Sequence, residues 1–489
     1  MTVKDIDMTC DLVIFGAKGD LSCRKLLPSL YKLEESNKLS KNMRIIGVGR
    51  ANWSTTEYIS IVQKSLKRFM KKKIEEDIWK IFSTRLNFCN LDVNETDNFL
   101  KLKNILCRRN SVIINYFAMP PNTFSSICKG LGKMNLNFEP NRIIIEKPLG
   151  LSLETSKEIN NEISKYFKEN QIFRIDHYLG KETILNLLAF RFANSLFYYN
   201  WNNKFIDHMQ ITIAEEIGIE DRKKYFNSTG QIRDMVQSHL LQILSIITMS
   251  KPIDLCSDNI QDEKIKILKA LRPFNSVNIH KKVILGQYSS GIMKGKKISS
   301  YLKDIGDEPS NTETFASIKV NIDTKEWKGV PFYLRTGKRL PKKYSEIVIF
   351  FKPIPINIFG NHYNNLYKNK ITIFLQPNEG IQIKIINKIP ELELKYNLTT
   401  ANLNFNYSKD FGKVILFDAY EKLLLEGIKG NRSLFVRRDE VELSWIWIDS
   451  IFNSFKGRKM SPILYSPGTW GPELSNSMIN YDGNKWNEF

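Results

Sequence analysis

Two hydrophobic patterns divide the chain. Up to about residue 176, short runs of β-branched and aromatic residues alternate with segments whose apolar residues recur at helical spacing. Such runs are typical of strands buried on both faces of a parallel sheet, with the helical segments as crossovers. The predicted strands are 11–15, 44–48, 112–117, 142–146 and 172–176. Residues 1–176 are therefore predicted to form a Rossmann-like, doubly wound α/β domain.

From about residue 205 onward, apolar and polar residues alternate over longer stretches. A period of two indicates strands with one solvated face, as in an antiparallel sheet. These stretches are 208–214, 316–322, 345–351, 370–375 and 381–386, and helical segments at 231–249 and 417–427 lie among them. Residues 177–489 are predicted to form an α+β domain with a large, mainly antiparallel sheet, and the boundary is expected near 173–181.

Composition places the chain among ordinary globular proteins. Of 489 residues, 42% are apolar and 25% are charged, so the chain is neither disordered nor fibrous. The six cysteines include no Cys-x-x-Cys pair, which argues against a disulfide framework and a zinc site. The first residues lack the apolar block of an export signal, and the apolar stretch 240–249 is too short to span a bilayer. We expect a cytoplasmic protein that does not bind membranes.

The net charge of the chain does not by itself identify a binding partner. The 72 Lys and Arg residues exceed the 52 Asp and Glu residues, which gives a formal net charge of +20. A nucleic-acid partner, phosphorylated small ligands or a general compositional preference for Lys would each produce this excess. Because the basic residues form no continuous stripe interleaved with aromatic residues, we expect no nucleic-acid partner.

A glycine loop follows the first predicted strand directly. It reads Gly16-Ala17-Lys18-Gly19-Asp20-Leu21 and opens a helix. Glycines in such a loop let the backbone approach a pyrophosphate, whose charge then faces free N–H groups at the helix N-terminus. Gly-x-x-Gly is a weak signal alone, but its position after the first strand of an α/β pattern favours a dinucleotide cofactor.

The end of the second predicted strand bears on which dinucleotide binds. An NAD enzyme of this fold places a carboxylate there to accept hydrogen bonds from the ribose hydroxyls. Here the strand runs into Arg50, and the next carboxylate along the chain is Glu57. A guanidinium suits a 2′-phosphate and Lys18 supplies a second cation, so the sequence favours NADP. The alternative is that Arg50 is an ordinary charged residue of a surface loop.

Further motifs lie at predicted carboxyl ends of strands, where ligands bind in an open α/β sheet. They are Glu146-Lys147-Pro148-Leu149-Gly150 and Asp176-His177-Tyr178-Leu179-Gly180-Lys181-Glu182. With the glycine loop, Arg335-Thr336-Gly337-Lys338 and Gly468-Thr469-Trp470-Gly471-Pro472, they make the whole chain resemble the glucose-6-phosphate dehydrogenase family, and its bacterial members in particular. The Asp-His-Tyr-Leu-Gly-Lys block resembles the family's active-site signature and is highly specific.

The resemblance implies a reaction and an assembly. The reaction is oxidation of β-D-glucose 6-phosphate to 6-phosphoglucono-δ-lactone with reduction of NADP, the first step of the oxidative pentose phosphate pathway. Residues 1–176 would bind the dinucleotide, and residues 177–489 would bind the substrate and form a homodimer or a higher homo-oligomer. No metal is expected, because hydride transfer does not demand one.

The resemblance makes His239 the general base that takes the C1 hydroxyl proton, and Asp176 the carboxylate that orients and stabilises the imidazolium. Judged without it, a histidine beside Leu240 and Leu241 on an apolar helix is more readily a core residue. Asp234, another matched position, lies five residues earlier, about 140° around an ideal α-helix. Either these two side chains flank the sugar from different directions or the helix is irregular.

Other matched positions supply the substrate contacts. The resemblance assigns the substrate phosphate to His177, Tyr178, Lys181 and Lys343, the sugar hydroxyls to Glu215, Asp234 and Lys338, and a place near both sugar and nicotinamide to Lys147. Taken alone, Glu215 beside Glu216 is as readily a solvated carboxylate. Cys23 departs from the family, many of whose members carry a basic residue there, whereas Lys25 matches.

Two other functions stay open on the sequence. Other sugar oxidoreductases also combine a Rossmann domain, a Glu-Lys-Pro strand end and an open antiparallel sheet, so another NADP-dependent pyranose dehydrogenase is one alternative. Efficient oxidation of unphosphorylated glucose would favour it. The other is a non-catalytic nucleotide-binding regulator or a nucleic-acid-binding protein, against which the presence of both Asp176 and His239 argues.

Overall fold

A computed structural model describes residues 9–70, 72–107, 111–355, 358–359, 368–392, 396–412, 417–455 and 461–487. These residues fall into two compact units. Unit 1 lies within Met1–Gly180, Pro252–Asp262 and Phe417–Glu442, and unit 2 lies within Lys181–Lys251, Glu263–Leu416 and Leu443–Phe489. The chain therefore returns to unit 1 twice after first leaving it.

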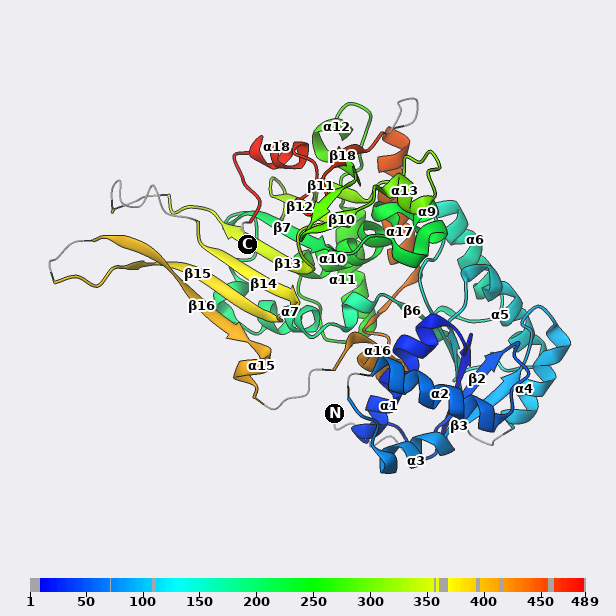
Figure 1. Ribbon diagram of the computed structural model, residues 1–489. Coiled ribbons are helices and arrows are strands. Elements are labelled where there is room, and N and C mark those ends of the chain that lie inside the picture. The colour runs from blue at the N-terminus through cyan, green and yellow to red at the C-terminus, as the bar shows by residue number, and fades with distance from the viewer. Residues whose placement is uncertain are drawn as a thin grey trace. The chain divides into compact units, whose positions relative to one another are not determined.

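Unit 1 is built on a seven-stranded sheet (Figure 1). Its strands are β1 (Cys10–Phe15), β2 (Arg44–Gly49), β3 (Leu86–Asn90), β4 (Val112–Phe117), β5 (Arg142–Ile145), β6 (Ile172–Ile175) and β17 (Phe435–Val436). Their order is β17-β6-β5-β4-β1-β2-β3, and neighbours are parallel except β17 and β6. The order of β1 to β6 is that of a dinucleotide-binding Rossmann sheet, which confirms the predicted fold class.

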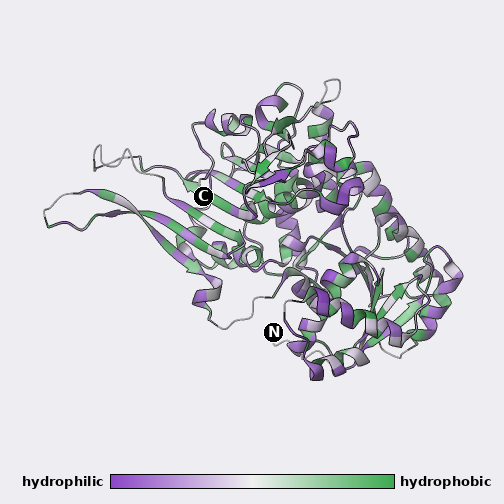
Figure 2. Ribbon diagram, viewed as in Figure 1, coloured by the Kyte–Doolittle hydropathy of each residue, from purple (hydrophilic) through white to green (hydrophobic). Residues whose placement is uncertain are grey.

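All five strands predicted in the first half are present, each within one residue of its predicted ends. Their residues are mostly apolar and buried, and the strands of this sheet are accordingly green in Figure 2. The prediction missed β3 and β17. Both lie at edges of the sheet. β3 carries asparagines at two of its five positions and β17 has only two residues, so neither shows a clear apolar run.

Helices cover both faces of this sheet (Figure 1). They are η1 (Ser22–Leu26), α1 (Leu27–Glu35), α2 (Thr55–Phe69), α3 (Glu76–Thr84), α4 (Phe99–Ile105), α5 (Phe124–Lys133), α6 (Leu153–Ser164) and α16 (Ala419–Lys429), with short turns η2 (Thr96–Asn98), η3 (Pro121–Thr123), η4 (Glu169–Gln171) and η5 (His177–Gly180). Three of them, α2, α6 and α16, begin with a capping box, which Ser54, Ser152 and Asp418 each form with the third residue of the helix. The helix predicted at 417–427 is α16, which belongs to unit 1.

Unit 2 contains a nine-stranded sheet. Its strands are β7 (Ile206–Ala214), β8 (Val283–Tyr288), β11 (Phe315–Asn321), β12 (Pro331–Gly337), β13 (Tyr344–Phe351), β14 (Lys370–Gln376), β15 (Gly380–Lys388), β16 (Leu398–Asn406) and β18 (Ile463–Tyr465). Their order is β16-β15-β14-β13-β7-β12-β11-β8-β18. Only the β7–β12 and β8–β18 pairs are parallel. The predicted large, mainly antiparallel sheet is confirmed, and its strands show mixed green and purple in Figure 2.

The other elements of unit 2 are mostly short. They are α7 (Glu182–Phe192), α8 (Ser195–Tyr198), η6 (Glu220–Arg222), α9 (Lys223–Gln231), η7 (Ile232–Leu240), α10 (Leu241–Thr248), α12 (Ile279–Lys282), α13 (Tyr301–Ile305), α15 (Tyr407–Asp410), α18 (Leu474–Asn480) and the hairpin β9 (Gly291–Met293) and β10 (Lys296–Ile298). Helices α11 (Ser257–Lys269) and α17 (Arg438–Ser454) contain residues of both units. None of the helices in the described part of the chain has the length and hydropathy that crossing a membrane requires.

Candidate active site

The glycine loop between β1 and η1 has a fixed backbone. The N–H groups of Gly16 and Ala17 donate to Val48 O at 3.0 and 3.1 Å, and the Gly19 N–H donates to Gly16 O at 2.9 Å. Gly16 has a φ of +89°, and a Cβ there would lie 2.5 Å from Ala118 O. Since both the backbone angle and the space exclude a side chain, this position requires glycine. The backbone of the loop is therefore free to approach a ligand closely.

The helix after the loop begins irregularly. Residues Ser22–Leu26 form a π-helix, and the buried Ser22 hydroxyl donates to Gly16 O at 2.8 Å. Ser22 therefore holds the loop through its side chain. Cys23, the position that departs from the family, points its thiol to Lys18 O at 3.8 Å. The loop is thus closed by contacts from within its own helix.

A cavity of about 590 Å³ opens beside this loop in unit 1. Residues 16–19 line it, as does Arg50, and so do residues that follow β2, β3 and β4. The carboxyl ends of neighbouring parallel strands meet at one edge of a sheet, which is where ligands bind in this fold. The size lies within the usual range for small-molecule sites. Five of the predicted cofactor residues, Gly16, Ala17, Lys18, Gly19 and Arg50, are thus gathered in one cavity.

The wall of this cavity combines cations with aromatic rings. Lys18 Nζ lies 5.7 Å from the centroid of the Trp53 ring, which in turn packs on Phe88 at 5.3 Å between centroids. Arg50 is exposed and has no ion pair among the described residues. The only carboxylate in the lining is Asp92, and its Oδ1 accepts from the Asn94 N–H at 3.0 Å. Anionic and planar groups therefore both find suitable partners here.

The remaining predicted cofactor residues of unit 1 lie outside the lining. Asp20 is exposed and forms an ion pair with Arg24 at 2.8 Å. Leu21 precedes the π-helix, and Lys147 follows β5. The sequence, in turn, missed Trp53 and Asp92 as lining residues. Asp92 follows the unrecognised strand β3, so its place at the ligand edge of the sheet had no signal in the hydrophobic pattern.

A partly buried carboxylate lies where β5 ends. Glu146 accepts hydrogen bonds from the hydroxyls of Tyr116 at 2.6 Å and Tyr420 at 3.2 Å. Burial raises the pKa of Glu146, while the two tyrosine hydroxyls and the charge of Lys147 oppose the rise. The Tyr420 ring also lies parallel to His177, with 6.4 Å between the ring centroids. Tyr420 comes from α16, far along the chain, and no pattern in the sequence pointed to it.

Asp176 and Tyr178 are held in a tight turn after β6. Asp176 is buried, and its Oδ1 accepts from the Tyr178 N–H at 3.0 Å, while its backbone O accepts from the Leu179 N–H at 3.0 Å. The turn η5 therefore fixes the carboxylate of Asp176 relative to His177 and Tyr178, and all three are predicted site residues within unit 1. Lys181, the first residue of unit 2, precedes α7 as its N-cap.

In unit 2, Glu215 and Lys338 form an ion pair, with 2.8 Å between Oε2 and Nζ. Glu215 follows β7 and Lys338 follows β12, and the parallel register pairs Ala214 with Gly337. Adjacent strand ends therefore bring these two predicted substrate residues together from positions 123 residues apart. The pairing shows that Glu215 has a specific cationic partner.

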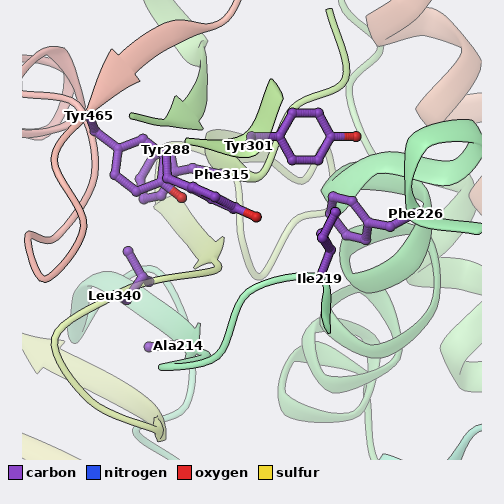
Figure 3. Close-up of a cluster of buried hydrophobic side chains, with 8 residues drawn as sticks. All are labelled: Ala214, Ile219, Phe226, Tyr288, Tyr301, Phe315, Leu340 and Tyr465. Carbon is purple, nitrogen blue, oxygen red and sulfur yellow. The ribbon is translucent and has the colours of Figure 1, made fainter. Parts of the chain in front are cut away.

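An aromatic cluster supports this pair. It consists of Ala214, Ile219, Phe226, Tyr288, Tyr301, Phe315, Leu340 and Tyr465 (Figure 3). Lys338 Nζ lies 5.0 Å from the Phe226 ring centroid, and the Tyr465 hydroxyl donates to Lys338 O at 2.6 Å. The cluster thus fixes both the ammonium group and the backbone of Lys338.

Asp234 and His239 lie on the π-helix η7, and both are buried. The Leu241 N–H that ends this helix donates to the carbonyl oxygens of both Ser238 and Val236, the latter five residues earlier. In a π-helix each N–H donates to the carbonyl oxygen five residues earlier. Residues five apart, such as 234 and 239, therefore lie closer to one face than they would in an α-helix. Of the two arrangements predicted for these residues, the irregular helix is confirmed. Tyr225 donates to Asp234 Oδ1 at 3.2 Å.

Lys343, a further predicted substrate residue, precedes β13. It lines a second cavity of about 960 Å³ in unit 2, together with Glu216, Tyr344, Phe374, Phe405 and Lys409. Its lining also contains Lys342 and Asp410, and Glu216 is paired with Lys294 at 2.6 Å. Three lysines therefore face two carboxylates in this cavity, which favours an anionic group.

Known proteins are similar to this chain over nearly its full length. Two family models match: "Glucose-6-phosphate dehydrogenase, NAD binding domain" over residues 13–186 and "Glucose-6-phosphate dehydrogenase, C-terminal domain" over residues 188–487. The glucose-6-phosphate 1-dehydrogenase of Buchnera aphidicola subsp. Baizongia pistaciae is 64% identical over 482 residues, 98% of each chain. That of Dickeya dadantii is 54% identical over 489 residues, which covers both chains completely.

A solved structure agrees with these matches. It is described as glucose-6-phosphate dehydrogenase in complex with its substrate glucose-6-phosphate, and it superposes with a TM-score of 0.90 at 32% identity. The match covers 99% of this chain and 100% of the other. Similarity of sequence and of fold therefore extends over both units.

Proposed function

This chain belongs to the glucose-6-phosphate dehydrogenase family and is an oxidoreductase, and from that premise we propose how it works. Its reaction is oxidation of D-glucose 6-phosphate at C1 to 6-phospho-D-glucono-1,5-lactone, the entry to the oxidative pentose phosphate pathway. The match to both family models and to full-length relatives carries this assignment. We propose NADP as the cofactor, with the roles below for individual residues.

The cavity of unit 1 would hold NADP. The loop Gly16–Gly19 would lie against the pyrophosphate, because its two glycines carry no side chain and the backbone hydrogen bonds of Gly16, Ala17 and Gly19 hold it in shape. Arg50 and Lys18 would bind the 2′-phosphate, which a bidentate guanidinium recognises well. When bound, the nicotinamide of this cofactor accepts the hydride from C1 of the sugar. The absence of a carboxylate at the end of β2 supports NADP over NAD.

His239 would act as the general base. It removes the proton from the C1 hydroxyl as the C–H electron pair leaves C1, so that the C1–O bond becomes the lactone carbonyl. Asp176 would orient the imidazole and stabilise its positive charge, which keeps proton transfer favourable near neutral pH. Lys147, with its fixed place after β5, would contact both the sugar and the nicotinamide.

The remaining residues would bind the sugar phosphate. The Glu215–Lys338 ion pair offers an acceptor and a donor at one point, as sugar hydroxyls require, and Asp234 adds a second acceptor. His177, Tyr178, Lys181 and Lys343 would bind the phosphate group, whose two charges favour several donors. The 960 Å³ cavity beside Lys343 supports an anionic ligand at that point.

Steady-state absorbance measurements of NADPH or NADH formation test these assignments. We expect glucose 6-phosphate to be oxidised far more efficiently than glucose, with NADP preferred to NAD. Arg50→Ala should raise KM for NADP about 10-fold, as loss of a charge-assisted contact predicts, and leave KM for NAD nearly unchanged. Equal weakening of both cofactors would refute the 2′-phosphate role, and equal rates with free glucose would refute the phosphate subsite.

We also propose that the protein acts in the cytoplasm as a homodimer or a higher homo-oligomer. The dinucleotide site would belong to residues 1–176, and substrate binding and dimerisation to residues 177–489. The family membership supports these statements. Sedimentation equilibrium of the purified protein would test the assembly, since a monomer at micromolar concentration would contradict it.

A further inference from the structure

The start of the helix that carries Asp234 and His239 is held by a buried acid. Glu313 lies two residues before β11, and its Oε1 accepts from the Ile232 N–H at 2.9 Å. Its backbone O accepts from the Gln231 N–H at 3.0 Å. The residue is only 2% exposed. Glu313 thus satisfies two N–H groups at a helix start, where such groups have no partner within the helix.

The two residues before Ile232 are also fixed, Gly230 by its close approach to Glu313 and Gln231 by a side-chain hydrogen bond. Gly230 has a φ of +73°, and a Cβ there would lie 2.5 Å from Glu313 Oε1. The buried Gln231 side chain donates from Nε2 to Thr336 Oγ1 at 2.8 Å. Since Thr336 belongs to β12, which leads to Lys338, the first turn of η7 is attached to the same strand end that carries a predicted substrate residue.

We propose that Glu313 is a positioning residue for the reaction, because it fixes η7, and with it Asp234 and His239, relative to the Glu215–Lys338 pair. This inference rests on the proposed function, in which His239 is the base. Glu313 acts through the helix and does not touch the substrate. A negative charge at a helix N-terminus is also stabilised by the helix dipole, so a carboxylate holds this end more firmly than an amide.

Stability and positioning can be separated at this residue. Burial raises the pKa of Glu313, and the Ile232 N–H and the nearby charge of Arg233 oppose the rise. A buried carboxylate therefore carries a desolvation cost that Glu313→Gln removes together with the charge. The amide keeps the size of the side chain and an oxygen that can accept from Ile232. We accordingly expect this variant to fold with a melting temperature close to that of the parent protein.

The first test compares Glu313→Gln with Glu308→Gln, an exposed glutamate in the same segment. Glu313→Gln should lower kcat about 10- to 100-fold, because the neutral amide holds the helix start less firmly than the carboxylate, and a displacement of about 1 Å at the reacting groups is enough for such a loss. KM for NADP should stay unchanged, since the unit 1 cavity is not altered. Glu308→Gln should match the parent in every measurement. An unchanged kcat in Glu313→Gln, with or without a lower melting temperature, would overturn the proposal.

The second test uses Gly230→Ala, whose added Cβ would push against the Glu313 carboxylate. This variant should lower kcat to a similar degree, and the double variant should be no worse than the poorer single variant, because both changes break one contact. Losses that multiply in the double variant would show independent effects and would overturn the proposal.

His239→Asn distinguishes failure of this inference from failure of the proposed function. If His239→Asn retains full kcat, the assignment of the base is wrong. If His239→Asn is inactive while Glu313→Gln keeps full kcat, only the positioning role of Glu313 is wrong.

Discussion

The proposed cofactor cavity of unit 1 and the Glu215–Lys338 pair of unit 2 differ in how the chain forms them. In unit 1 the proposed cradle is a short stretch of backbone in which Gly16 and Gly19 lie together. In unit 2 the proposed substrate contacts are side chains, and Glu215 and Lys338 meet from 123 residues apart. A backbone site is specified by a local pattern of glycines, whereas a side-chain site depends on strand register.

Both regions nevertheless use a π-helix at the point of function. η1 directly follows the glycine loop, and η7 carries Asp234 and His239. π-turns are rare and cluster at functional sites because they place residues at spacings that an α-helix does not allow. The comparison therefore predicts that side-chain losses in unit 2 reduce the chemical step, while backbone changes in unit 1 reduce cofactor binding.

The largest expected effect is that of His239→Asn. Loss of the general base should lower kcat about 10²- to 10⁴-fold, with much smaller changes in KM for sugar and cofactor. Steady-state kinetics at saturating NADP measure it. The matched control is His280→Asn, an exposed histidine on α12, which should be fully active. Full activity of His239→Asn would show that His239 is not the general base and that unit 2 does not supply the chemical step through this side chain.

Gly16→Ala should affect binding and leave the chemical step intact. Its methyl group would meet Ala118 O at 2.5 Å at a φ of +89°, so the loop must move. KM for NADP should rise about 10-fold or more, with backbone strain of about 1–3 kcal/mol lowering stability. Gly295→Ala is the control, because it has a φ of +76° but nothing within 4 Å. If both variants raise KM for NADP equally, the effect of Gly16→Ala does not come from a displaced glycine loop.

Lys181→Ala should weaken recognition of the substrate phosphate. Removal of a charge-assisted contact should raise KM for glucose 6-phosphate about 10-fold, while the low rate with free glucose stays the same. Parallel assays with both sugars provide the measurement and its own control. An unchanged KM for glucose 6-phosphate would exclude Lys181 from the phosphate site.

The smallest effect is expected for Tyr465→Phe, which tests the support of Lys338. The variant loses the hydrogen bond from the Tyr465 hydroxyl to Lys338 O and leaves that buried carbonyl without this donor. The free energy of unfolding should fall by about 1–3 kcal/mol in urea titration, as for other unsatisfied buried groups. A stability equal to the parent's would show that the aromatic cluster holds Lys338 by packing alone.

Much of unit 1 could be predicted from the sequence. Its five central strands are continuous apolar runs, and burial on both faces of a sheet leaves little freedom in such runs. The glycine loop and Arg50 were found for a related reason, since they directly follow these strands. The edge strand β3 escaped detection because its polar positions break the run, and Asp92, which follows it, was missed with it. Trp53, between β2 and α2, was missed because a single aromatic residue in a loop shows no pattern. Tyr420 was missed because it reaches Glu146 from a distant helix.

In unit 2 the alternating strands were predicted, but the site was not predictable from residue patterns alone. Glu215, Asp234, Lys338 and His239 were named through resemblance to a family. Hydrophobic periodicity could not tell a core histidine from a base, and the period of 3.6 residues separated Asp234 from His239. The π-helix removed that separation. Glu313, which holds the start of this helix, had no signal in the sequence.

The sequence by itself determined the fold class, the glycine cradle and the preference for a cationic residue at the second strand end, because each depends on residues close together in the chain. Only the tertiary structure decided which distant side chains meet. The parallel register of β7 and β12 paired Glu215 with Lys338, and the buried carboxylate of Glu313 and the space at Gly230 fixed the start of the π-helix. Such contacts depend on strand order and packing, which no local pattern of residues encodes.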